Sequence, residues 1–197
     1  MEKIKQRFFW LAVLVGASGI GYLLANNWGK IYGAINVRFS FEERIPFVPN
    51  AIFVYLLVFT FLLMPVFIVR KYADFIEVLA IYALLVAVSL ATFFAFPTTM
   101  ERPHAPDFGF VGWLFGAVRA IDGPNNLFPS LHVSSVVYVA FVNGYFCPKA
   151  KWISWICAIL VSVSTLLVKQ HALVDVFGGA VLGATAFVLL WVLRRKE

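Results

Sequence analysis

Long apolar runs restrict the fold of this chain more than any other feature of its sequence. Six such runs occur, and most approach the roughly 17–22 residues with which a helix crosses the ~30 Å hydrocarbon core of a membrane. A soluble domain carries about 25% charged residues, whereas this chain of 197 residues is 13% charged and 62% hydrophobic. The runs comprise residues 8–24, 51–69, 75–96, 133–146, 152–168 and 176–193.

These runs predict an all-α fold, an integral membrane bundle of six helices. The fourth run is short, and we expect its helix to recruit residues from the preceding segment, NNLFPSLH. Residues 97–130 are rich in proline and glycine and include an amphipathic piece, residues 108–121, which is typical of a short interfacial helix along the outer membrane surface. No repeat of fixed period and no low-complexity segment occurs, so we expect one membrane-embedded domain over residues 1–197.

The lysines and arginines between the runs predict the orientation in the membrane. Ten of them lie at the two termini and in the second and fourth connections, against six in the other three connections, which are also longer. Since cytoplasmic segments carry the excess of basic residues, both termini are expected in the cytoplasm. The net charge of +6 therefore reflects membrane insertion, and no nucleic-acid partner is expected.

This orientation gathers the polar residues on the extracytoplasmic side. Residues 25–50, 97–132 and 169–175 lie there, and the last two of these segments contain all three histidines of the chain. We therefore expect any active site at the outer membrane boundary. The two cysteines form no metal-binding set, and no metal or other cofactor is expected.

His171 and Asp175 are the first candidate pair for chemistry. They are four residues apart, so on a helix they would share one face. A carboxylate beside an imidazole fixes its tautomer and leaves the other nitrogen free to attack or to transfer a proton. A satisfied polar pair between helices is the alternative, but ionisable residues at membrane depth are costly, which favours a function.

Other polar residues on the same side complete the candidate site. A second imidazole, His132, would allow a two-step transfer in which one histidine attacks and the other protonates the leaving group. Arg102 and Lys169 would supply positive charge for phosphoryl oxygens, although each could instead anchor a helix end. Ser130 precedes an apolar run and could be a helix N-cap or part of an anion site. His104 has no partner that the sequence indicates.

Three short motifs in this order resemble those of the type 2 phosphatidic acid phosphatase superfamily, over about residues 44–185. Arg102-Pro103 matches the end of the first motif, Lys-x6-Arg-Pro. Residues 129–132, Pro-Ser-Leu-His, match the second motif, Pro-Ser-Gly-His, with leucine in place of glycine. Ser164, His171 and Asp175 match the third motif, Ser-Arg-x5-His-x3-Asp, at the right spacing.

The resemblance implies a role for each matching residue. His171 would be the nucleophile that forms a phosphohistidine, and Asp175 would orient it. His132 would be the acid that protonates the departing alcohol. Arg102 and Ser130 would hold phosphate oxygens, and the substrate would be a lipid phosphate in the membrane bilayer.

Two cations of the family pattern are absent from this chain. The lysine of the first motif falls at Ala95, and the arginine of the third motif falls at Thr165. Lys169, two residues before His171, is the expected substitute for one of them. The sequence Pro-Ser-Leu-His and the pair Ser164-Thr165 resemble the branch that includes inositol phosphorylceramide synthase.

Three functions follow as alternatives. The first is an integral membrane lipid phosphate phosphatase, and the second is a phosphotransferase that moves a phospho-head group to a lipid or polyol acceptor. The third is a non-catalytic lipid-binding protein, which the presence of both His132 and His171 disfavours. The expected location is a plasma membrane of bacterial type. Oligomeric state is not predicted, although Gly179-x-x-x-Gly183 would allow close helix packing.

Overall fold

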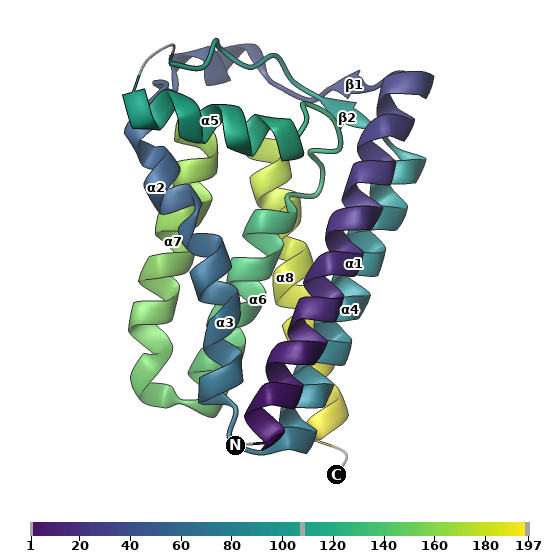
Figure 1. The fold of residues 1–197 in the computed structure, drawn as a ribbon, viewed down its shortest axis with the longest axis vertical. Helices are drawn as coiled ribbons and strands as arrows, with labels where there is room; N and C mark the ends of the chain where they lie inside the picture. The colour runs from purple at the N-terminus through teal and green to yellow at the C-terminus, as the bar shows by residue number, and fades with distance from the viewer. Residues whose placement is uncertain (1, 107–108, 196–197) are drawn as a thin grey trace.

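The computed structural model describes residues 2–106 and 109–195, which form an upright bundle of helices with one helix lying across its end (Figure 1). Helix α5 is the crossing helix, and short 3₁₀ turns and a pair of two-residue strands connect the others. The helices are α1 (Glu2–Tyr32), α2 (Ile52–Tyr55), α3 (Leu57–Ile68), α4 (Tyr72–Ala95), α5 (Gly109–Ile121), α6 (Leu131–Phe146), α7 (Lys151–Leu167) and α8 (Leu173–Arg194).

Five helical segments of the described residues are long and apolar enough to cross a membrane. They confirm an integral membrane protein with a nearly all-α fold, and they cover every predicted run except the fourth. The five segments are Lys3–Tyr32, Pro49–Ile68, Tyr72–Ala95, Pro148–Leu167 and Leu173–Arg194.

Helix α6 corresponds to the fourth predicted run and is shorter than the five segments that could cross a membrane. It has 16 residues, or a length of about 24 Å, and it takes only Leu131 and His132 from the preceding segment. Ten of its residues are buried, because α3, α4, α7 and α8 all pack against it. Helix α6 is therefore the centre of the bundle, and a sixth complete span stays a prediction.

Two glycines of α8 allow it to approach α6 closely. A Cβ atom added to Gly179 would lie 2.6 Å from the carbonyl oxygen of Ser130, and one added to Gly183 would lie 2.5 Å from that of Ser134. Real Cβ atoms do not come so near to backbone atoms. The Gly-x-x-x-Gly pattern thus serves packing within one chain.

The two ends of the bundle differ in what they carry. Both termini lie at one end, while α5, β1 and β2 lie at the other (Figure 1). Strands β1 (Ile35–Asn36) and β2 (Thr98–Thr99) are parallel and pair Ile35 with Thr98. This arrangement agrees with the predicted grouping of the outer segments. The crossing helix α5 matches the predicted interfacial helix from residue 109 onward, and Phe108 lies outside the described residues.

Thr98 joins the segment after α4 to the segment that precedes α6. Its carbonyl oxygen accepts a hydrogen bond from the N–H of Asn126 at 2.7 Å. Its hydroxyl accepts from the N–H groups of Leu127 and Phe128, each at 2.9 Å. These bonds fix the loop that carries Arg102 beside the start of α6.

Candidate active site

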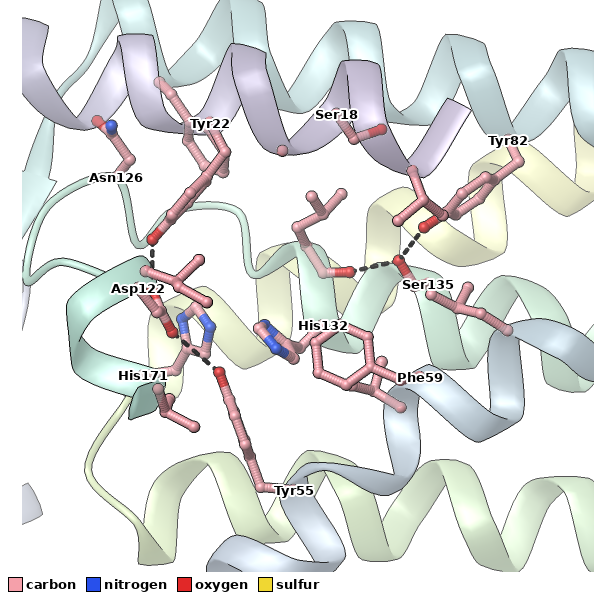
Figure 2. Close-up of a pocket in the computed structure, with 18 residues that line it drawn as sticks. Ser18, Tyr22, Tyr55, Phe59, Tyr82, Asp122, Asn126, His132, Ser135 and His171 are labelled. Carbon is pink, nitrogen blue, oxygen red and sulfur yellow. Dashed lines mark hydrogen bonds between the residues drawn. The ribbon is translucent and has the colours of Figure 1, made fainter. Parts of the chain in front are cut away.

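His132 and His171 come together beneath α5 from different parts of the chain (Figure 2). His132 lies in the first turn of α6, and His171 lies between α7 and α8. Their ring centroids are 5.8 Å apart. The structure thus brings together the two imidazoles that the sequence predicts as attacking group and proton donor.

A tight connection between α7 and α8 positions His171. Lys169 follows the C-cap of α7, Val168, and has a positive φ of 54°, a conformation common just after helix ends. The carbonyl oxygen of Thr165 then accepts from the N–H groups of Gln170 at 3.0 Å and His171 at 3.3 Å. The His171 side chain is only 7% exposed, so the connection holds the imidazole inside the protein.

Asp175 lies beside His171, but the two residues do not share one face of a helix as the sequence predicts. His171 is not helical, because α8 begins at Leu173 with Ala172 as its N-cap. The Nδ1 atom of His171 is still 3.6 Å from Oδ2 of Asp175, which is fully buried. The same Oδ2 accepts from the N–H of Ala172 at 2.7 Å. Asp175 therefore both caps α8 and faces the imidazole.

Ser130 is the N-cap of α6. Its Oγ accepts from the N–H of Val133 at 3.3 Å, and its own N–H donates to the carbonyl oxygen of Asp175 at 3.0 Å. The second bond ties the start of α6 to the start of α8. The capping role that the sequence allows for Ser130 is therefore present in the structure, and a contact with phosphate stays a prediction.

Arg102 reaches the same region from the loop after β2. Its Nη1 donates to the carbonyl oxygen of Asp122 at 2.7 Å, and its Nη2 donates to that of Gln170 at 3.4 Å. Nη2 also lies 3.8 Å from the Oδ1 atom of Asp122. Arg102 is therefore held next to the residue that precedes His171.

Lys169 points away from the histidines, toward the segment before α2. Its ammonium donates to the carbonyl oxygen of Glu42 at 3.1 Å, and it lines a polar pocket of about 340 Å³ together with Arg38 and Arg102. Burial and the neighbouring Arg38 lower the pKa of Lys169. The predicted contact with phosphate would require the ammonium to leave Glu42 or the phosphate to reach this pocket.

The two positions where the family cations are absent have different surroundings. Ala95 is exposed at the end of α4, and Thr165 is buried in α7, where its hydroxyl donates to the carbonyl oxygen of Ser162 at 2.7 Å. His104, for which the sequence indicates no partner, is exposed.

A carboxylate that the sequence leaves without a role lies at the centre of the site. Asp122 follows α5, and its Oδ2 accepts from the hydroxyl of Tyr55 at 2.9 Å. Its Oδ1 accepts from the hydroxyl of Tyr22 (Figure 2). Burial raises the pKa of Asp122, but the opposing effect of Arg102, His132 and His171 is larger. The pKa of Asp122 therefore lies below its ordinary value.

Tyr55 also contacts a predicted catalytic histidine directly. Its ring stacks on that of His132, with centroids 4.5 Å apart and planes inclined by 28°. Tyr55 comes from α2, whereas Tyr22 comes from α1. Neither tyrosine stands out in an apolar run, and an aromatic residue near a predicted span end is the one weak signal that the sequence offers for them.

The histidines close the polar end of a cavity of about 230 Å³. Val15, Val58, Phe59, Leu62 and Phe93 are among its apolar lining residues, and they come from α1, α3 and α4. The cavity extends along the bundle, away from α5, beside these helices (Figure 2). An apolar chain and a polar head group would therefore find matching surroundings in one continuous space.

The long apolar helices and the neighbouring histidines His132 and His171 define an integral membrane protein with a candidate site at one end of its bundle. Residues 119–197 match the family model of the PAP2 superfamily. This part of the chain, which contains Ser130, His132, His171 and Asp175, is therefore similar to the superfamily of type 2 phosphatidic acid phosphatases. The branch that includes inositol phosphorylceramide synthase stays a prediction.

The match to this superfamily supports phosphatase or phosphotransferase activity on phosphate esters. No curated protein and no solved structure matches the chain.

Proposed function

We propose that this protein is an integral membrane lipid phosphate phosphatase that works through a phosphohistidine on the extracytoplasmic side. The observation that carries the proposal is the pair His132 and His171, 5.8 Å apart, at the polar end of an apolar cavity. The lipid chain would occupy the cavity while its phosphate meets the two imidazoles.

The reaction has two steps. Nε2 of His171 attacks phosphorus, the bond from phosphorus to the lipid oxygen breaks, and His132 gives its proton to the departing alkoxide. A water molecule then attacks the phosphohistidine, its proton passes to His132, and the bond from phosphorus to nitrogen breaks. Asp175 would hold the His171 ring in place through Nδ1, from which its Oδ2 is 3.6 Å distant.

Arg102, Ser130 and Lys169 are the proposed contacts to phosphate oxygens. Arg102 already lies at the carbonyl group of Gln170, next to His171. Ser130 would contribute the start of α6, whose N–H groups favour an anion. Lys169 would act through the pocket that it shares with Arg102.

A phosphotransferase is the second candidate function. In that reaction a lipid or polyol hydroxyl replaces water in the second step. The resemblance of Pro-Ser-Leu-His and of the pair Ser164-Thr165 to the branch that includes inositol phosphorylceramide synthase supports this candidate.

The test is turnover of a panel of lipid phosphates by the purified protein in detergent, with free phosphate and lipid products measured separately. We expect His171→Ala to abolish turnover and His132→Ala to reduce it nearly as much. His104→Ala is the matched control, since His104 is exposed, and it should retain wild-type turnover. Full activity of His171→Ala would exclude the phosphohistidine.

Two further measurements bear on the same proposal. Activity should persist in excess EDTA, since no step uses a metal ion, and a strict requirement for a divalent metal would contradict the scheme. Single cysteines at Glu101 and Lys149, in a variant without Cys147 and Cys157, should be labelled from opposite sides of the membrane. Labelling of both from one side would contradict the proposed orientation.

A further inference from the structure

A buried carboxylate outside the histidine cavity holds the connection between α7 and α8. Glu42 lies in the 3₁₀ helix η1 (Ser40–Arg44), between β1 and α2, at the end of the bundle that also carries α5 (Figure 1). It is only 3% exposed. Its Oε2 accepts a hydrogen bond from the N–H of Leu173 at 2.9 Å, two residues after His171. A side chain from a distant segment thus contacts the backbone beside the proposed nucleophile.

Two carboxylates hold consecutive N–H groups at the start of α8. Oδ2 of Asp175 accepts from the N–H of Ala172 at 2.7 Å, and Glu42 accepts from the next N–H, that of Leu173. The first N–H groups of a helix have no partner within the helix, and the helix dipole favours negative charge near them. Hydrogen bonds with an ionised acceptor are also stronger than neutral ones. The backbone that follows His171 is therefore held both from within α8 and from η1.

Further bonds fix the segment that carries Glu42. The second oxygen of the carboxylate, Oε1, accepts from the N–H of Phe39 at 3.1 Å. The carbonyl oxygen of Glu42 accepts from the ammonium of Lys169 at 3.1 Å. The N–H of Val48 donates to the carbonyl oxygen of Leu167 at 2.9 Å. The segment before α2 is thus joined to the end of α7 as well as to the start of α8.

The position of the His171 imidazole depends on this backbone. Its Nδ1 lies 3.6 Å from Oδ2 of Asp175, which is longer than a hydrogen bond, and Nδ1 has no hydrogen-bond partner among the described residues. Glu42 does not occur among the described lining residues of the histidine cavity or of the pocket that Lys169 lines. Any effect of Glu42 on the reaction therefore passes through the backbone and not through the substrate.

We propose that Glu42 is a positioning residue for His171, which keeps the imidazole in the place from which it attacks phosphorus. The inference rests on the proposed function, in which His171 is the nucleophile. Glu42 neither touches the substrate nor transfers a proton. Its loss lowers the rate at which the phosphohistidine forms and leaves substrate binding nearly unchanged.

The first test is steady-state turnover of phosphatidic acid by full-length variants in detergent. Glu42→Ala loses the acceptor for Leu173, and we expect kcat to fall by at least about tenfold, with KM changed by less than about twofold. Glu42→Gln keeps an oxygen at the same place and should retain kcat within about threefold of wild type.

Glu77→Ala is the matched control for the loss of a carboxylate that holds α8. Oε2 of Glu77 accepts from Arg194 at 2.6 Å, at the opposite end of that helix. Glu77→Ala should lower the melting temperature and keep wild-type kcat per folded molecule. An equal loss of kcat in Glu77→Ala and Glu42→Ala would show a general effect of weaker helix packing and would overturn the inference.

The second test does not depend on turnover. Hydrogen exchange of the backbone amides in residues 171–175 is measured by mass spectrometry on the protein in lipid nanodiscs. Glu42→Ala should speed exchange in this segment by at least about tenfold, because the N–H of Leu173 loses its acceptor. Glu77→Ala should leave this exchange within about twofold of wild type.

Leu173→Pro removes the donor of the same bond. Leu173 is the first residue of α8, a position that accepts proline well because the N–H there has no partner within the helix. The loss of kcat should resemble that of Glu42→Ala. If one bond carries both effects, adding Glu42→Ala to Leu173→Pro should change kcat by less than about twofold.

Three results would overturn the inference. They are unchanged kcat in Glu42→Ala despite faster amide exchange, equal losses of kcat in Glu42→Ala and Glu42→Gln, and additive losses in the double variant. If Glu42→Ala does not fold, Leu173→Pro alone decides, and wild-type kcat in that variant would overturn the inference. None of these results touches the proposed function, which is tested by His171→Ala. Turnover that survives His171→Ala would contradict the proposed function, and the exchange measurement would still show whether Glu42 holds the connection.

Discussion

The ring of Tyr55 stacks on the ring of His132 with centroids 4.5 Å apart, and the Tyr55 hydroxyl donates to Asp122. The Tyr55 side chain thus connects His132, the proposed general acid, with the carboxylate of Asp122. Because Tyr55 is nearly fully buried at 1% exposed, its ring has little freedom to move, and it fixes one face of His132.

We therefore expect two substitutions of Tyr55 to differ. Tyr55→Phe keeps the stack and loses one hydrogen bond, so kcat should fall by about tenfold or less. Tyr55→Leu also loses the stack, and a misplaced acid should lower kcat by about 10²-fold. Phe53→Leu is the control, since Phe53 is exposed on the same helix. Equal kcat values for the two Tyr55 variants would show that the stack does not position His132.

Asp175 has two contacts that substitutions can separate. Asp175→Asn retains an oxygen for the N–H of Ala172 but loses the charge beside His171, so turnover should fall by roughly 10²-fold or more at unchanged stability. Asp175→Ala should lose the cap as well, at a cost of about 1 kcal/mol. Thermal unfolding and kcat are measured for each variant. Asp74→Asn, at the opposite end of the bundle, should keep full turnover per folded molecule.

The close approach of α6 and α8 predicts a loss of stability when its glycines gain a side chain. Gly183→Ala places Cβ 2.5 Å from the carbonyl oxygen of Ser134, and the helices must separate at a cost of about 1–3 kcal/mol. Gly16→Ala is the matched control, because no described atom lies within 4 Å of its added Cβ. A Gly183→Ala protein as stable as Gly16→Ala in detergent would contradict the packing.

Gly179→Ala should affect activity as well as stability. Its Cβ would approach the carbonyl oxygen of Ser130 to 2.6 Å, and Ser130 is bonded to Asp175. Separation of α6 from α8 at this point would therefore separate His132 from His171. We expect a larger loss of kcat for Gly179→Ala than for Gly183→Ala.

Lys169 is tested by its effect on kinetics. If it contacts phosphate, Lys169→Met should lower kcat/KM by more than about tenfold, equivalent to ~1.4 kcal/mol, and Lys169→Arg should retain part of the activity. Its bond to Glu42 gives a contrasting expectation for a purely structural lysine, which is a lower melting temperature with unchanged kcat/KM. Lys30→Met, exposed at the end of α1, is the control for loss of a surface charge.

The lowered pKa of Asp122 predicts that the stability of the folded protein depends on pH. Its pKa in the folded protein lies below the value of 3.8 expected when the chain is unfolded. The ionised carboxylate therefore stabilises the fold above pH 3.8, and this contribution is lost as the pH falls through the lowered pKa. Asp122→Asn should be less stable than wild type near neutral pH, with the difference shrinking below pH 3.8. A difference that widens in acid would have the wrong sign.

Much of the fold could be predicted from the sequence because membrane helices depend on local composition. Every predicted apolar run contains a helix. The spacing of His171 and Asp175 also predicts their proximity, although the sequence does not show that α8 begins between them. The proximity of residues within one short segment can thus be predicted from their spacing. The exact start of the helix cannot, because it depends on capping by Asp175 itself.

Contacts between distant segments could not be predicted in this way. Asp122 is 67 residues from Tyr55 and 100 residues from Tyr22, and nothing in the local pattern pairs them. Arg7 is a second case, since its charge counts toward the predicted orientation, yet it is buried and donates to the carbonyl oxygens of Val66 and Val69. Such pairings arise only when helices far apart in sequence are packed together.

The cavity has a consequence for how this protein could diverge. Its apolar walls come mainly from α1, α3 and α4 in the first half of the chain, whereas His132 and His171 come from the second half. Under the proposed function, most of the surface that would contact the lipid chain is therefore encoded apart from the two histidines that would react. Recombination near residue 100 would alter the fit for the lipid chain and leave both histidines in place.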